Sequence, residues 1–322
     1  MLRRTLLLSL AAAAMAGPAL AQTFPPAKPV TMYVGFAPGG AADSSARLIA
    51  KKLTENIGQS VVVENKPGAG GNIAHQLTAQ GPADGSVILF GSIGPLTIAP
   101  HMLKVGYDPF KDLAPLSGGV QFASILVVNS QASGIKTLAD FVAAAKKNPG
   151  GVTFASTGPG SASHLTGELF AQRAGVEMTH VPYRGGSAAM PDLLAGRFTS
   201  YFAAPPTALP QIEAGKITPI ATTGLQRMRE LPNVPTVAES GYAGFEALNW
   251  YAFVASAKTP KEILDRWNVE IVKVLNDPAT KDQLLKHGVT PMPTTREQFA
   301  EFMKKESEQW GKIVREKKIT GE

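Results

Sequence analysis

Short apolar runs alternate along the chain with stretches in which apolar residues recur every three or four positions. The run at 30–34 predicts a strand, and after the loop at 35–40 the apolar residues repeat with helical spacing until Gly58. Repeated strand–helix alternation is typical of α/β folds in which helices flank mainly parallel sheets. The predicted strands are 30–34, 61–63, 87–90, 125–128, 152–155, 178–181, 198–202 and 217–221.

The pattern changes toward the end of the chain. An apolar, aromatic segment at 245–254 has no helical period, and Pro260 then opens a region that is predicted to be helical and to contain no strand. The last two predicted helices cover 279–286 and 296–318. We therefore expect this tail to pack on a lobe that earlier residues have already formed.

The first residues have the order of charge and hydrophobicity that an export signal needs. Arg3 and Arg4 precede a short apolar stretch at 5–16, and Ala19-Leu20-Ala21 forms a small-x-small cleavage site. We expect residues 1–21 to be a signal peptide that is cleaved after Ala21. Export could follow either the general or the twin-arginine route. The mature protein is then expected in the periplasm.

The length of the mature chain predicts two lobes. Cleavage leaves 322 − 21 = 301 residues, which exceeds the usual size of a single core. We assign 22–124 and 247–322 to lobe one and 125–246 to lobe two. The chain then crosses between the lobes near Ala123 and near Asn249, and two crossings form a hinge with a cleft opposite it.

Composition excludes several classes of function. The chain has no Cys, so thiol catalysis, disulfides and a lipid-modified Cys at the signal junction are all excluded. The formal charge is +6, but positions 261–318 hold 12 Lys and Arg interleaved with 10 Asp and Glu, a pattern typical of solvated helix faces. We expect no nucleic-acid partner, no membrane span and no lipid anchor.

Four glycine-rich loops lie between predicted strands and helices, at 38–40, 67–71, 158–161 and 185–186. Glycine lets a ligand approach the backbone closely, and the unpaired N–H groups at a helix start attract an anion. One such loop is often only a turn, but four distributed over both lobes favour an anion site, above all at the first and third loops. Arg184, beside the fourth loop, either meets a second acidic group of the ligand or lies on the surface.

Motifs for other chemistry are incomplete. Gly158, Gly160 and Ser163 resemble a dinucleotide fingerprint that lacks its third glycine, and no phosphate-binding P-loop or nucleophile elbow is present. The spacing of the histidines predicts no metal site, so neither a metal nor a cofactor is expected; they are His75, His101, His164, His180 and His287. His164 could serve as a base for Ser161 in a hydrolase, but orientation of the loop or contact with a ligand is the favoured interpretation.

The loops and their neighbours resemble the Bug-type receptors of tripartite tricarboxylate transporters. The matching stretches run in order through nearly the whole mature chain: GFAPGGAADSSARLIA (35–50), VVVENKPGAGGNIA (61–74), DGSVILFGS (84–92), YDPFKDLAPLS (107–117), FASTGPGSASHLTGELF (154–170), HVPYRGGSAAMPDLLAG (180–196) and NWYAFVASAKTP (249–260). The resemblance implies a two-lobed flytrap receptor that grips a carboxylate, partly through ordered water. His75 stands where a small residue is expected, which leaves the role of the second loop open.

The resemblance also implies a set of ligand-binding positions. In lobe one these are Phe36, Gly39, Gly40, Ala41 and Ser92. In lobe two they are Ser156, Thr157, Gly160, Ser161, Ser163 and His164, with Tyr183, Gly185 and Ala204 completing the pocket.

The sequence therefore predicts a solute receptor that closes around a small carboxylate and delivers it to a membrane permease. We expect a monomer that makes and breaks no bond. The alternatives are a secreted hydrolase that uses Ser161 and His164, a receptor for an ATP-driven transporter, and a partner of a sensor kinase. The residues do not identify the carboxylate.

Overall fold

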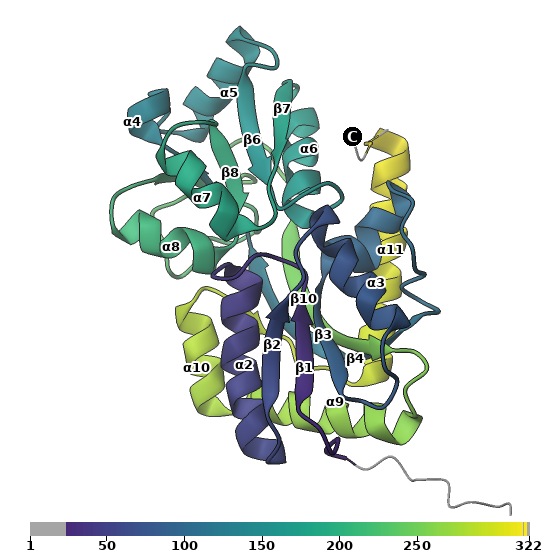
Figure 1. Cartoon of the computed structure of the whole chain (residues 1–322). Helices are drawn as coiled ribbons and strands as arrows, with labels where there is room; N and C mark the ends of the chain where they lie inside the picture. The colour runs from purple at the N-terminus through teal and green to yellow at the C-terminus, as the bar shows by residue number, and fades with distance from the viewer. Residues whose placement is uncertain (1–23, 318, 321–322) are drawn as a thin grey trace, which may run out of the picture.

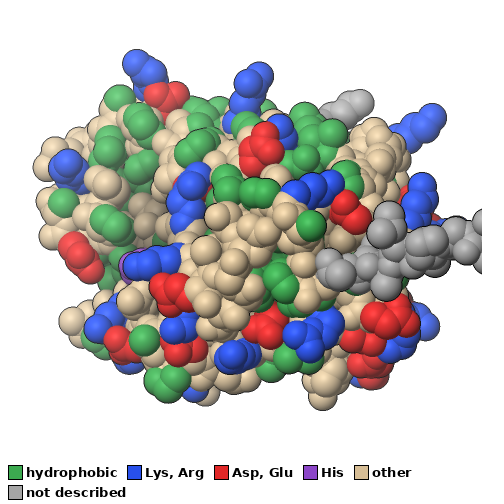
Figure 2. Space-filling model, turned by 60° about the horizontal axis from the view of Figure 1, so that its bottom comes forward, with side chains coloured by type: hydrophobic (Ala, Val, Ile, Leu, Met, Phe, Trp, Pro, Cys, Tyr) green, Lys and Arg blue, Asp and Glu red, His purple; other side chains and the backbone are tan. Residues whose placement is uncertain are grey.

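The computed structural model describes residues 24–317, 319 and 320, which form two α/β lobes side by side (Figure 1). The predicted signal peptide and its cleavage site lie outside the described residues. Within the described part of the chain, no helix is long and apolar enough to cross a bilayer. Basic and acidic side chains are interspersed over the face seen in Figure 2, as on an ordinary solvated surface.

The first lobe is built on a six-stranded sheet with the order β11-β4-β10-β3-β1-β2. Strands β1, β2, β3 and β4 run in one direction, whereas β10 is antiparallel to both β3 and β4, and β11 is antiparallel to β4. The strands are β1 Val30–Val34, β2 Val61–Asn65, β3 Val87–Ser92, β4 Leu113–Ala123, β10 Leu248–Ser256 and β11 Thr290–Pro291.

Helices cover both faces of this sheet (Figure 1). On one face α2, α9 and α10 enclose an apolar core around Trp267, and on the other α3 and α11 enclose a core around Trp250 and Phe299. The helices are α2 Ala41–Ile57, α3 Asn72–Gln80, α9 Lys261–Asn276, α10 Pro278–Lys286 and α11 Arg296–Lys317, with short turns η1 Ala69–Gly71, η2 Gly94–Ile98 and η3 Ala99–His101.

The second lobe holds a five-stranded sheet with the order β7-β6-β8-β5-β9, in which only β5 runs against its neighbours. Its strands are β5 Ile125–Val128, β6 Val152–Ser156, β7 Met178–Pro182, β8 Ser200–Ala203 and β9 Thr218–Thr222. The helices are α4 Ser130–Ser133, α5 Leu138–Lys147, α6 Ala162–Ala174, α7 Gly186–Leu194 and α8 Pro205–Glu213. One apolar core lies toward α5 and α6, and another toward α7 and α8.

The predicted two-lobed α/β fold is confirmed, with two corrections in the first lobe. The sequence pattern missed β4, because Pro115, Gly118 and Gly119 interrupt its apolar run. The expectation of no strand after Pro260 is wrong at Thr290–Pro291, where two residues pair with β4; a strand this short has no alternation to detect. Both sheets are mixed, although most strands of each run in one direction.

Thr223 joins the two chain segments that connect the sheets. β4 ends at Ala123 and β5 begins at Ile125, so the chain leaves the first sheet at Ser124 and returns to it just before β10. The buried Oγ1 of Thr223 accepts a hydrogen bond from the Ser124 N–H (2.8 Å) and donates one to the Ala247 carbonyl (2.7 Å). Its backbone N–H and carbonyl bond to the same two residues. This threonine therefore holds the two crossings together.

Replacing Thr223 with Val should lower the free energy of unfolding by about 2 kcal/mol or more, because the Ser124 N–H and the Ala247 carbonyl each lose a buried partner. The neighbouring Thr222→Val is a matched control, since Thr222 Oγ1 is equally buried but has no hydrogen-bond partner among the described residues. Urea unfolding of both variants gives the comparison. Equal stability of the two variants would contradict the role assigned to Thr223.

Candidate functional site

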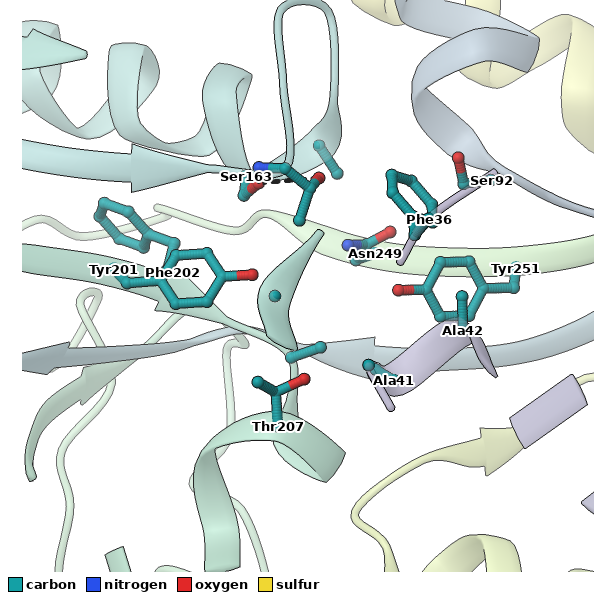
Figure 3. Close-up of a pocket in the computed structure, with 15 residues that line it drawn as sticks. Phe36, Ala41, Ala42, Ser92, Ser163, Tyr201, Phe202, Thr207, Asn249 and Tyr251 are labelled. Carbon is teal, nitrogen blue, oxygen red and sulfur yellow. Dashed lines mark hydrogen bonds between the residues drawn. The ribbon is translucent and has the colours of Figure 1, made fainter. Parts of the chain in front are cut away.

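A small cavity lies between the lobes, and the volume open to the centre of a water molecule is about 30 Å³. Figure 3 shows side chains from both lobes pointing into it, including the hydroxyls of Tyr201 from β8 and Tyr251 from β10. None of the lining residues carries a charge. They are Phe36, Gly40, Ala41, Ala42, Ser92, Thr157, Ala162, Ser163, Gly186, Tyr201, Phe202, Ala204, Thr207, Asn249 and Tyr251.

The starts of four helices meet at this cavity. The first residues of α2 and α6, and the first residue of α7, line it, and their N–H groups make no hydrogen bond to the described residues. α8 begins with Pro205 and Pro206, which have no N–H, so it presents the Thr207 side chain instead. Unpaired amides and aligned helix dipoles make this an environment for a negative charge.

A buried carboxylate shapes the first loop behind the cavity. Gly39 takes a positive φ of 78° and its N–H donates to Asp43 Oδ2 (2.9 Å), which also accepts from Arg47 Nε (3.0 Å). Burial raises the pKa of Asp43, but the hydrogen bonds from Arg47, Gly39 and Asn65 outweigh that effect and hold the pKa below its usual value. The charge of Asp43 is thus satisfied within the loop, and the amides of α2 stay open toward the cavity.

The third loop uses most of its amides to fold itself. The N–H of Thr157 donates to Ser163 Oγ (3.0 Å), that of Gly158 to Ser156 Oγ (3.0 Å) and that of Gly160 to His164 Nδ1 (3.3 Å). Only the amides at the start of α6 that follow are left for a ligand. The loop therefore supports the start of α6, and its own amides are not free to bind a ligand.

His164 supports the loop and does not pair with Ser161 through its ring. Its Nδ1 accepts from Gly160, its Nε2 lies 3.8 Å from Glu168, and its ring stacks on His180 at 4.0 Å. Burial, with a smaller contribution from His180, lowers the pKa of His164 to about 3. The buried Ser161 Oγ instead accepts from the backbone N–H of His164 (3.4 Å), so the hydrogen bond that the hydrolase alternative requires is missing here.

Half of the predicted ligand-binding residues line the cavity, and the others stand behind it. The lining set is Phe36, Gly40, Ala41, Ser92, Thr157, Ser163 and Ala204. The set outside the lining is Gly39, Ser156, Gly160, Ser161, His164, Tyr183 and Gly185. The Arg184 side chain is exposed. The backbone carbonyl of Arg184 accepts a hydrogen bond from the Ala37 N–H across the cleft (3.0 Å).

The sequence interpretation missed eight lining residues, and four of them lie on the strands β8 and β10. Their apolar patterns indicated strands but not which side chains face the other lobe. For these strand residues the signal was the polar Asn249 at the edge of an apolar run, whereas Gly186 lies in the fourth glycine-rich loop. The missed residues are Ala42, Ala162, Gly186, Tyr201, Phe202, Thr207, Asn249 and Tyr251.

Glycines allow the two lobes to touch through their backbones around the cavity. A Cβ on Gly70 would lie 2.3 Å from the Pro159 carbonyl oxygen, and one on Gly94 would lie 2.7 Å from that of Gly160. Across the first loop, Ser187 Oγ donates to the Pro38 carbonyl (2.8 Å). The second loop thus contributes Gly70 to the contact between the lobes and not to the cavity wall.

The two lobes and the cavity enclosed between them define a solute-binding protein of the periplasmic type. The family model of the tripartite tricarboxylate transporter family receptor matches residues 45–319. BugT of Bordetella pertussis is 35% identical over 95% of this chain and 94% of its own. The chain belongs to the tripartite tricarboxylate transporter receptor family.

Solved structures show the same fold. The periplasmic binding protein BugD has a TM-score of 0.88 and 31% identity, over 92% of this chain and 99% of its own. An R. palustris protein with adipate has a TM-score of 0.88 and 32% identity, with the same coverage. MatC from Rhodopseudomonas palustris with bound malate has a TM-score of 0.85 and 27% identity, over 90% of this chain and 99% of its own.

The buried histidines predict a loss of stability in mild acid. Burial lowers the pKa of His164 to about 3 and those of His75 and His180 to about 4, whereas unfolded histidines titrate near 6.5. Below about pH 6.5 the unfolded chain therefore binds more protons. The free energy of unfolding should fall toward pH 4, by up to about 1.4 kcal/mol per pH unit for each histidine.

His164→Asn isolates one of these histidines, because the Asn oxygen can still accept from Gly160 but does not titrate. Urea unfolding at several pH values between 7 and 4.5 should give a shallower fall for the variant than for the wild type. Parallel curves would show that His164 does not contribute to the pH dependence of the free energy of unfolding.

Proposed function

We propose that this protein is a periplasmic receptor that captures a small carboxylate between its lobes and delivers it to a membrane permease of the tripartite tricarboxylate type. The observation that supports this most directly is the meeting of unpaired amides from α2, α6 and α7 in an uncharged cavity. A carboxylate provides the acceptors that these amides lack. The adipate and malate in the related structures are small carboxylates of this kind.

Free energies support a site that needs both lobes. A hydrogen bond to a charged group contributes roughly 1.5–3 kcal/mol, so four or five amides give about 6–15 kcal/mol. Association costs at least about 4 kcal/mol of this, and micromolar binding requires about 8 kcal/mol. The amides of α2 in lobe one, or those of α6 and α7 in lobe two, are too few alone. Binding is then coupled to closure.

The remaining parts of the proposal rest on the sequence and on the loop geometry. Residues 1–21 direct export and are removed after Ala21, and the hinge separates lobe one (22–124 and 247–322) from lobe two (125–246). The protein acts as a monomer without catalysis or a cofactor. Residues such as Gly39, Gly160 and His164 serve the ligand indirectly, by holding the loops that place the helix starts.

Ala41→Pro tests the amides directly. Ala41 is the first residue of α2 and Gly40 before it is extended (φ −84°, ψ 177°), so proline fits the backbone while removing one N–H. Isothermal titration against di- and tricarboxylates, aromatic acids and amino acids should show micromolar binding of a carboxylate to the wild type. The affinity should be about tenfold to a hundredfold weaker in the variant.

Lys261→Pro is the matched control, because it also places proline at the first position of a helix but lies at the exposed start of α9. Its affinity should equal that of the wild type. If no carboxylate in the panel binds the wild type, the proposed function is wrong. Unchanged binding by Ala41→Pro would show that the Ala41 N–H at the start of α2 does not bind the ligand.

Gly94→Ala tests whether closure is required. The three atoms nearest to its added Cβ would all belong to the opposite lobe, in Gly160, Ser161 and Ala162, and Gly94 does not line the cavity. The ligand-free variant should unfold within about 1 kcal/mol of the wild type, because the atoms nearest to the added Cβ belong to the opposite lobe. Its carboxylate affinity should fall at least tenfold, and X-ray scattering should show no contraction when ligand is added. If Gly94→Ala kept the wild-type affinity and still contracted on ligand addition, the contact of Gly94 with Gly160 would not be required for closure.

A further inference from the structure

The cavity holds a buried acceptor that a carboxylate alone cannot satisfy. Asn249 projects into it from β10, and its Oδ1 is buried without a hydrogen-bond partner among the described residues (Figure 3). Its Nδ2 makes no hydrogen bond to them either, so an unpaired acceptor remains whichever way round the amide lies. A carboxylate brings only acceptors, and therefore leaves this one unpaired.

Ser92 strengthens the observation from the end of β3. It is 4% exposed, lines the same cavity, and its Oγ has no partner among the described residues. Buried polar groups in folded proteins are almost always paired, so two such groups on one small cavity indicate that the ligand supplies their partners. A hydroxyl in the ligand can both donate to Asn249 and accept from Ser92.

The charge of the lining selects among the possible donors. An ammonium group could also donate to Asn249, but no Asp or Glu lines the cavity to balance its charge. Burial raises the pKa values of Tyr201 and Tyr251 above the usual range, so these two phenols stay protonated and neutral as well. An uncharged hydroxyl is the donor that fits this environment.

We propose that the cavity selects a small hydroxycarboxylate, in which the helix starts hold the carboxylate and Asn249 accepts a hydrogen bond from the hydroxyl. This inference rests on the proposed function, because it assigns the part of the ligand that the amides do not hold. It makes Asn249 a specificity-determining residue and leaves carboxylate binding itself to α2, α6 and α7.

Titration calorimetry with matched acids tests the hydroxyl. The pairs are malate with succinate and lactate with propanoate, and aspartate provides the ammonium analogue of malate. The wild type should bind the hydroxy acid of at least one pair ten or more times more tightly than its partner, and more tightly than aspartate.

Asn249→Leu keeps the approximate shape of the side chain and removes both its acceptor and its N–H donors. In this variant the hydroxy acid and its partner should bind within about threefold of each other. Thr222→Val, which alters a buried hydroxyl that does not line the cavity, should keep the full preference.

Four results would overturn the inference, and they differ in which other parts of the proposal they contradict. Equal binding of both acids of each pair by the wild type contradicts the hydroxyl but leaves the carboxylate receptor intact, and so does a preference for aspartate. A preference that persists in Asn249→Leu removes Asn249 as the acceptor. Failure of every acid to bind contradicts the proposed function together with this inference. The comparison of acids on the wild type decides the first two even if the variant does not fold.

Discussion

The N–H groups at the start of a helix have no acceptor within that helix, and this protein encloses several of them in one cavity. Burial of an unpaired donor costs about 1–3 kcal/mol. The starts of α2, α6 and α7 come from both lobes, so the closed form carries this cost unless something between the lobes accepts their hydrogen bonds. An anion removes the cost, which gives the ligand a physical reason to favour closure.

Closure in turn depends on backbone that can approach backbone. Gly70 and Gly94 of the first lobe meet the loop at 158–161 at distances that leave no room for a Cβ. Thr223 lies where the chain passes between the sheets, and it bonds to Ser124 and Ala247 in the two crossing segments. The glycine contacts and the Thr223 hydrogen bonds thus lie on separate parts of the chain, and none of them involves a charged side chain.

The sequence predicted the elements and loops well, because strand–helix alternation and glycine positions are local signals. It could not show which amides of the third loop are free, because that depends on Ser156, Ser163 and His164 folding back onto the loop. It also could not place Tyr201 or Tyr251. A strand pattern shows that a residue is buried but not whether it faces its own core or another lobe.

Helix-start amides and strand side chains have different roles in how such a receptor discriminates between ligands. Amides at helix starts recognise any carboxylate, since they contact only the group that all such ligands share. Asn249 of β10 points from its strand into the cavity and makes no side-chain hydrogen bond to the described residues, whereas Tyr251 on the same strand packs on Phe36 of the first loop. The Asn249 side chain can therefore change without breaking a hydrogen bond that holds the loops. Under the proposed function, the count of donors and acceptors on these strands would set which carboxylate fits this uncharged cavity.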